Sequence, residues 1–225
     1  MVYRNRIEAA ERLAEALAQW RGSRPLVVAI PRGAVPMGAV IAHRLDGDLD
    51  VVLVRKLHAR WNPELAIGAV DERGWTWLAP HGERVGATPD YIEREKGDEL
   101  AILRERRARY TPERAPIDAK DRNVIVVDDG LATGATMIAA LHAMRARAPR
   151  WLICAIPVAA PEALERVRPY ADEVLCLETP EWFYAVGQAY HDFTQVSDDE
   201  VIAALGAAAA PGARSSPSAR ERERR

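Results

Sequence analysis

The 225-residue sequence has few cysteines, few aromatic residues and almost no net charge. Its two cysteines, Cys154 and Cys176, fall in short apolar runs, which predicts buried reduced thiols and excludes a disulfide framework. A formal net charge of -2 creates no overall field that would attract nucleic acid or a membrane surface. No apolar run approaches the ~18 residues of a membrane helix, and the opening residues lack the apolar segment of a secretion signal. We therefore expect a soluble cytoplasmic protein with no membrane partner and no nucleic acid partner.

The sequence does contain short apolar runs that alternate with helical patterns. Strands buried on both faces are expected to be apolar throughout, as are the runs at 26–30, 124–127 and 151–158. Runs that are apolar apart from charged residues at their ends occur at 50–55 and 173–177 and are also predicted to be strands. Helix-like spacing of apolar residues or helix-favouring composition is found at 7–20, 35–45, 89–110, 135–147 and 161–167. This alternation predicts an α/β fold with a parallel, doubly wound sheet flanked by helices and joined by right-handed crossovers.

Two internal segments lie outside this alternation. Residues 65–70 and 75–78 are joined by an Asp-Glu-Arg-Gly turn, which predicts a small hairpin added to the main sheet. Residues 56–64 show no clear period and are predicted to form a loop.

Two further segments are unusual in composition. The arginines of 104–109 are interspersed with glutamates along the helix, so we interpret them as a solvated helix face rather than an RNA-binding surface. Residues 206–225 are rich in Ala, Ser, Pro and Arg and cannot bury enough apolar area to offset ordering entropy. We expect a folded domain at 1–205 followed by a disordered tail at 206–225.

The stretch VIVVDDGLATGAT at 124–136 carries the clearest chemistry. Four apolar residues bring Asp128 and Asp129 to the C-terminal end of a strand, where open α/β sheets bind ligands. The glycines, threonines and new helix N-terminus that follow favour a phosphate, although the lysine of a Walker loop is missing. The pattern predicts a sugar phosphate with its phosphate in the loop and its hydroxyls on the carboxylates. For the two aspartates alone, a plain strand-to-helix turn capped by Asp is the alternative.

The same string resembles the signature of type I phosphoribosyltransferases, which bind 5-phosphoribosyl-1-pyrophosphate (PRPP). It has the same four apolar residues, two acids, a spacer and a Thr-Gly-x-Thr loop. The resemblance runs from about 7 to 205, includes VLVRK and NPELAIGAV, and is closest to bacterial phosphoribosyltransferases of unknown acceptor. It implies an enzyme that binds PRPP with Mg²⁺ and transfers phosphoribosyl to a small-molecule acceptor with release of pyrophosphate. Homodimers are common among such proteins, so a homodimer is one expectation.

The resemblance also assigns roles to residues of the signature. Asp128 and Asp129 would bind the ribose hydroxyls. The loop would hold the 5-phosphate through backbone N–H groups and threonine hydroxyls, and its members are Gly130, Leu131, Ala132, Thr133, Gly134, Ala135 and Thr136. Mg²⁺ would be bound through PRPP, so we expect no direct protein ligand to the metal.

Other roles fall outside the signature. Arg32 and Gly33 match the loop that meets pyrophosphate, and Lys56 would stabilise its departing charge. The plain alternatives are a surface arginine in a turn and a solvated strand end. Residues 58–64 match the mobile loop that covers the site in this family, and we interpret His58 as an exposed loop residue. The predicted catalytic residues are Arg32, Lys56, Asp128 and Asp129.

The acceptor is where the sequence departs from its relatives. Ala132 stands where purine-salvage members carry an acid that helps to deprotonate the base, which argues against transfer to hypoxanthine-type bases. Trp182 and Phe183 follow the last strand and are candidates for stacking on a planar acceptor, with core packing as the alternative. A non-catalytic module that senses PRPP or a nucleotide is the alternative function.

Overall fold

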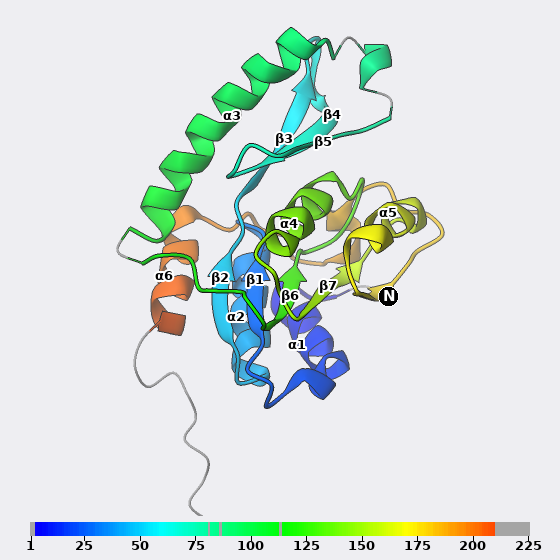
Figure 1. Ribbon diagram of the computed structural model, residues 1–225. Helices are drawn as coiled ribbons and strands as arrows, with labels where there is room; N and C mark the ends of the chain where they lie inside the picture. The colour runs from blue at the N-terminus through cyan, green and yellow to red at the C-terminus, as the bar shows by residue number, and fades with distance from the viewer. Residues whose placement is uncertain (1–2, 81, 86, 113, 210–225) are drawn as a thin grey trace, which may run out of the picture.

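The computed structural model describes residues 3–80, 82–85, 87–112 and 114–209. Its core is a five-stranded sheet in the order β2-β1-β6-β7-β8, and every pairing in it is parallel (Figure 1). The strands are β1 (Leu26–Ala29), β2 (Asp48–Val51), β6 (Asn123–Val127), β7 (Trp151–Val158) and β8 (Glu173–Glu178). The predicted parallel, doubly wound sheet is therefore confirmed.

Helices cover both faces of this sheet, as the uniformly apolar strands require. Successive strand side chains point to opposite faces, so Val27 and Ala29 join one core cluster while Leu26 and Val28 join the other. The first cluster is closed by α1 (Arg6–Ala16) and α2 (Ala34–Arg44), and the second by α4 (Ala135–Arg145) and α5 (Pro161–Val167). Both thiols are free, as predicted, and Cys154 is buried in β7, whereas Cys176 in β8 is only half-buried and not fully buried as expected.

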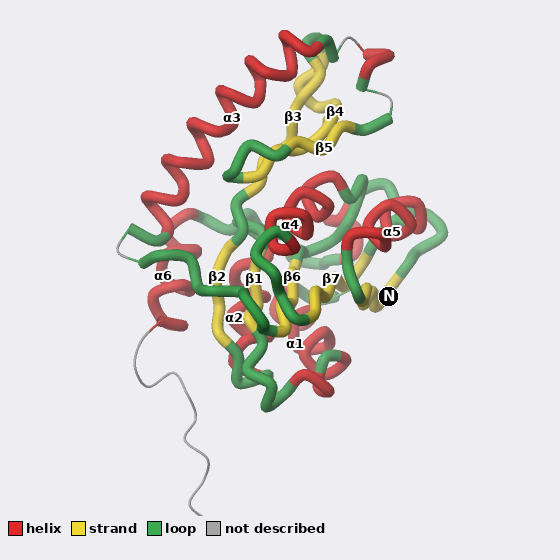
Figure 2. The backbone as a smooth tube through the Cα atoms, viewed as in Figure 1, coloured by secondary structure: helices red, strands yellow, loops and turns green. Residues whose placement is uncertain are grey.

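A second, smaller unit stands above the core, and we call it the arm (Figure 1, Figure 2). It consists of an antiparallel sheet and one long helix, with the elements β3 (Val54–Ala59), β4 (Asn62–Asp71), β5 (Thr76–Leu78) and α3 (Pro89–Tyr110). The arm rests on α4, where the Trp75 ring stacks on His142 with 3.5 Å between ring centroids. The predicted hairpin is confirmed as β4 and β5, within a larger sheet than the sequence indicated.

Two sequence predictions in this region are wrong. The apolar run 50–55 is not one strand, because β2 ends at Val51 in the core sheet and β3 begins at Val54 in the arm. Residues 56–64 are not a loop either, since β3 continues to Ala59 and β4 begins at Asn62. The β3–β4 ladder shifts register on both sides of His58, and such an irregularity breaks the alternation that normally reveals a strand.

The last described helix, α6 (Asp198–Ala209), packs beside α2, β2 and α3. It runs through 206–209, which the sequence placed in a disordered tail; residues 210–225 of that predicted tail lie outside the described residues. Within the described ranges, no helix is both long enough and apolar enough to cross a membrane.

Candidate active site

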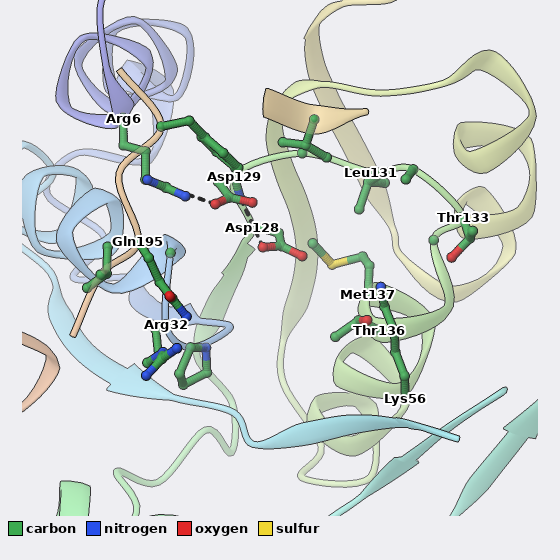
Figure 3. A pocket seen from close by; sticks show the side chains of 18 of the residues that line it. Arg6, Arg32, Lys56, Asp128, Asp129, Leu131, Thr133, Thr136, Met137 and Gln195 are labelled. Carbon is green, nitrogen blue, oxygen red and sulfur yellow. Dashed lines mark hydrogen bonds and ion pairs between the residues drawn. The ribbon is translucent and has the colours of Figure 1, made fainter. Parts of the chain in front are cut away.

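A cavity of about 470 Å³ opens at the carboxyl ends of β1 and β6 (Figure 3). The chain leaves β1 toward β2 on one side and returns as β6 on the other, so this is the point where strand order reverses and where open α/β sheets bind ligands. The structure brings most of the predicted site residues together here: Arg32, Gly33, Lys56, Asp128, Asp129, Gly130, Leu131, Ala132, Thr133, Gly134 and Thr136 all line the cavity.

The loop between β6 and α4 has the geometry of a phosphate site. Gly134 adopts a left-handed φ of +80° directly before α4, whose first N–H groups are directed toward the loop, as at any helix N-terminus. Ala135 is buried and does not line the cavity with its side chain. The Leu131 N–H already donates to the Val158 carbonyl at 3.0 Å, which ties Leu131 to the edge of β7. This bond narrows the predicted phosphate-binding backbone from 131–136 to 132–136.

Asp128 and Asp129 lie side by side at the floor of the cavity (Figure 3). The Asp129 N–H donates to Asp128 Oδ1 at 2.9 Å. Burial and the neighbouring Asp129 charge raise the pKa of Asp128 well above its usual value. Burial also raises the pKa of Asp129, against the opposing effect of Arg6. The site thus holds two carboxylates that hydroxyl donors or a cation would stabilise, and such oxygen donors suit Mg²⁺.

Arg6 is a site residue that no sequence motif predicts. Its Nε donates to Asp129 Oδ2 at 2.8 Å, and a terminal nitrogen donates to the Thr194 carbonyl at 2.8 Å. Its guanidinium lies 3.8 Å from the centroid of the Phe193 ring. Arg6 and Asp129 are 123 residues apart in the sequence, so no local motif signals the pair.

Asp129 is held from two further sides. The Tyr190 hydroxyl donates to the Asp129 carbonyl at 2.6 Å. A Cβ atom at Gly33 would lie 2.2 Å from Asp129 Oδ2 and 3.1 Å from Arg6 Nε, so only glycine fits there. The loop that carries Gly33 includes a cis peptide bond between Pro31 and Arg32. The close approach at Gly33 packs this loop directly against the carboxylate floor.

Positive charge dominates the walls of the cavity. In the described part of the chain, its charged lining residues are two carboxylates and four cations: Asp128, Asp129, Arg6, Arg32, Lys56 and Arg106. Lys56 extends from β3 toward Thr136 (Figure 3). Arg32 faces Asp198 at the start of α6, with 3.6 Å between a guanidinium nitrogen and Oδ1. This balance favours a ligand with several negative charges.

The predicted acceptor residues are not among those that line the cavity. Trp182 is 74% exposed, and Phe183 packs against the hydrophobic core. The segment after β8 contributes a different set of side chains to the cavity wall, namely Val186, Phe193, Gln195 and Val196. The sequence predicts aromatic side chains in this region, but only the tertiary structure shows which of them reach the site.

A second cluster of polar residues lies on the arm, outside this cavity. His58, Glu95 and Glu99 place one potential metal-ligand atom each within 4.8 Å of one another. His58, predicted to be an exposed loop residue, is half-buried on β3, and its Nδ1 lies 3.4 Å from Glu95 Oε1. Arg55 forms an ion pair with Glu99, so part of the negative charge is already balanced within the arm.

A helix N-terminus beside two carboxylates, at the switch point of a doubly wound sheet, places the chain among the α/β proteins whose cavity lies at the carboxyl ends of parallel strands. Comparison with known families makes the class specific. The chain belongs to the phosphoribosyl transferase domain family, which matches residues 2–194, and its fold is that of the type I members, as predicted.

Individual relatives agree with this assignment. Proteins of two Mycobacterium tuberculosis strains, CDC 1551 and H37Rv, are named as phosphoribosyl transferases and are 41% identical over 208 residues. The match covers 91% of this chain but 46% of theirs, so the chain spans about half the length of these curated relatives. The crystal structure of TT1426 from Thermus thermophilus is 46% identical, with a TM-score of 0.77 and coverage of 91% of this chain and 98% of that one.

Proposed function

We propose that the protein binds PRPP together with Mg²⁺ and transfers the phosphoribosyl group to a small acceptor, releasing pyrophosphate. The observation that carries this proposal is the meeting of three features in one cavity. These are the loop before α4, the carboxylates of Asp128 and Asp129, and the cations Arg32 and Lys56. Each suits one part of PRPP, namely its 5-phosphate, its ribose hydroxyls and its pyrophosphate.

In the proposed complex, the 5-phosphate accepts hydrogen bonds from the backbone of 132–136 at the start of α4. The ribose hydroxyls donate to Asp128 and Asp129, which relieves the repulsion between the two carboxylates. The pyrophosphate then lies toward Gly33, Arg32 and Lys56. Bound Mg²⁺ would neutralise part of the charge on the leaving pyrophosphate.

The proposed reaction is substitution at ribose C1 through an oxocarbenium-like transition state. The bond from C1 to the pyrophosphate oxygen breaks, and its electron pair leaves with the pyrophosphate, while a lone pair of the acceptor forms the new bond to C1. Arg32 and Lys56 stabilise the charge that develops on this group. The carboxylates of Asp128 and Asp129 hold the ribose and fix the direction from which the acceptor approaches C1.

A module that senses PRPP without catalysis is the second candidate, and Ala132 favours it. The side chain at this position cannot take a proton from an acceptor. Release of pyrophosphate in the presence of candidate acceptors separates the two functions, because a sensor binds PRPP without consuming it. The same measurement with different acceptors would identify the acceptor. Homodimer formation and a cytoplasmic location stay predictions.

Calorimetric titration of PRPP, with and without Mg²⁺, tests the proposal. We expect saturable binding that needs Mg²⁺ and is tighter than binding of ribose 5-phosphate or nucleoside monophosphates. The double variant Asp128→Asn, Asp129→Asn should weaken PRPP binding while the fold is retained. The matched control is Glu162→Gln, Glu165→Gln, which removes the same charge from exposed positions of α5. Absence of PRPP binding by the unmodified protein would refute the proposed function.

A further inference from the structure

Arg106 reaches the cavity from outside the core. It lies near the C-terminal end of α3, in the arm. It nevertheless lines the same cavity as the loop before α4 and the two aspartates. Its sequence neighbours predict a solvated helix face for it. That interpretation holds for Arg104, which is exposed, but Arg106 is half-buried at the cavity.

The neighbours of Arg106 on α3 are already engaged. Arg107 forms an ion pair with Glu72 at 2.6 Å, and Arg109 forms one with Asp198 at 2.8 Å. Arg106 makes no hydrogen bond or ion pair with any residue that the structure describes. A half-buried guanidinium has five N–H donors, and those of Arg106 remain open to a ligand.

Charge around Asp198 shows where Arg106 acts. Asp198 pairs with Arg32 across 3.6 Å and accepts a hydrogen bond from the Tyr110 hydroxyl. The Tyr110 hydrogen bond, together with the charges of Arg109, Arg32 and Arg106, lowers the pKa of Asp198. Arg32 and Arg106 both lie close enough to Asp198 for their charges to act on its carboxylate, so the two guanidinium groups occupy one region of the cavity wall.

We propose that Arg106 is a further ligand-binding residue, which contacts the pyrophosphate end of PRPP beside Arg32 and Lys56. This inference rests on the proposed function and adds to it a cation supplied by the arm helix. Pyrophosphate bears several negative charges, and the two cations Arg32 and Lys56 do not neutralise all of them. A guanidinium suits a phosphate group because its planar fork donates two parallel hydrogen bonds.

Titrations with PRPP, inorganic pyrophosphate and ribose 5-phosphate test the role of Arg106. In Arg106→Gln, we expect PRPP and pyrophosphate to bind about 10-fold to 30-fold more weakly, as for loss of a charge-assisted hydrogen bond. Ribose 5-phosphate lacks the pyrophosphate, so its affinity should be unchanged. Arg106→Lys keeps the charge without the fork and should recover part of the lost affinity.

The control is Arg104→Gln, which removes the same charge from an exposed position on the same helix and should change PRPP affinity by less than about 2-fold. Unchanged PRPP and pyrophosphate affinity in Arg106→Gln would overturn the inference. An equal loss of ribose 5-phosphate affinity would also overturn it, because it would show a general structural effect. If the unmodified protein does not bind PRPP, the proposed function fails, and the pyrophosphate titration still tests Arg106 separately.

Discussion

Removal of Arg6 from its ion pair with Asp129 should destabilise the protein at neutral pH. Both side chains are largely buried, with 12% and 16% exposed, and their charged atoms lie 2.8 Å apart. Replacing Arg6 with Gln removes the positive charge but leaves Asp129 in place beside Asp128. The variant therefore leaves a buried carboxylate without its main compensating charge.

The size of this effect follows from the geometry. Two unit charges 2.8 Å apart attract by ~6 kcal/mol at an effective dielectric constant of ~20, and desolvation of both groups offsets much of that. Removing one partner of a fully buried ion pair costs ~3–5 kcal/mol. Arg6 and Asp129 are both slightly exposed to solvent, so we expect a smaller cost here. We expect Arg6→Gln to lower the free energy of unfolding by ~2–3 kcal/mol at pH 8. Loss of the guanidinium over Phe193 is part of this figure.

Urea unfolding in a double-mutant cycle with Asp129→Asn measures the charge interaction itself. In the Asp129→Asn background, Arg6→Gln should cost less than ~1 kcal/mol, because the carboxylate that Arg6 contacts directly is already gone. In the single variant, removal of Arg6 raises the pKa of Asp129 further, since Arg6 opposes the effect of burial. The cost should therefore shrink as the pH falls from 8 to 5 and Asp129 takes up a proton. Equal costs in both backgrounds and at both pH values would show that Arg6 acts only through packing.

Two other predictions concern the floor of the cavity. Gly33→Ala introduces a Cβ 2.2 Å from Asp129 Oδ2. We expect the free energy of unfolding, measured in urea, to fall by ~1–3 kcal/mol, and the PRPP affinity, measured by calorimetry, to fall at least ~10-fold. Unchanged PRPP affinity would contradict the close packing of this loop on Asp129. Asp128→Asn should raise the free energy of unfolding at pH 8 by ~0.5–2 kcal/mol while weakening PRPP binding. The pKa of Asp128 is raised in the folded state, so the free energy of unfolding of the unmodified protein falls as the pH rises and Asp128 loses its proton. The increase in the free energy of unfolding of Asp128→Asn should therefore be smaller at pH 5. An increase that does not depend on pH would show that it does not come from the charge of Asp128.

The sequence was sufficient for the fold of the core but not for that of the arm. Strands such as Trp151–Val158 are apolar throughout because both of their faces are buried, and this property is visible locally. The break between β2 and β3 is not visible locally, because Val52 and Leu53 are as apolar and as buried as their neighbours. Which sheet a strand joins depends on distant pairing, and the register shifts around His58 hid β3 as well.

The sequence likewise predicts some of the site residues and not others. Residues 128–136 are contiguous, so their order alone predicts a phosphate loop after two acids. Arg6, Arg106 and Phe193 come from segments that carry no motif, and only the packing of α1, of α3 and of the segment after β8 brings them to the cavity. Leu131 shows the opposite case, since it lies within the motif but its N–H group serves the sheet.

Lys56 and Arg106 belong to the arm, whereas Asp128, Asp129 and the loop before α4 belong to the core. A polyanion in the cavity would therefore touch both units, with its negative groups lying between cations that are anchored in separate parts of the fold. If PRPP is the ligand, as proposed, its binding and the packing of the arm on the core would be thermodynamically linked, so that each would strengthen the other by the same free energy. The ligand would then form part of the contact between the two units, and departure of pyrophosphate would remove that part.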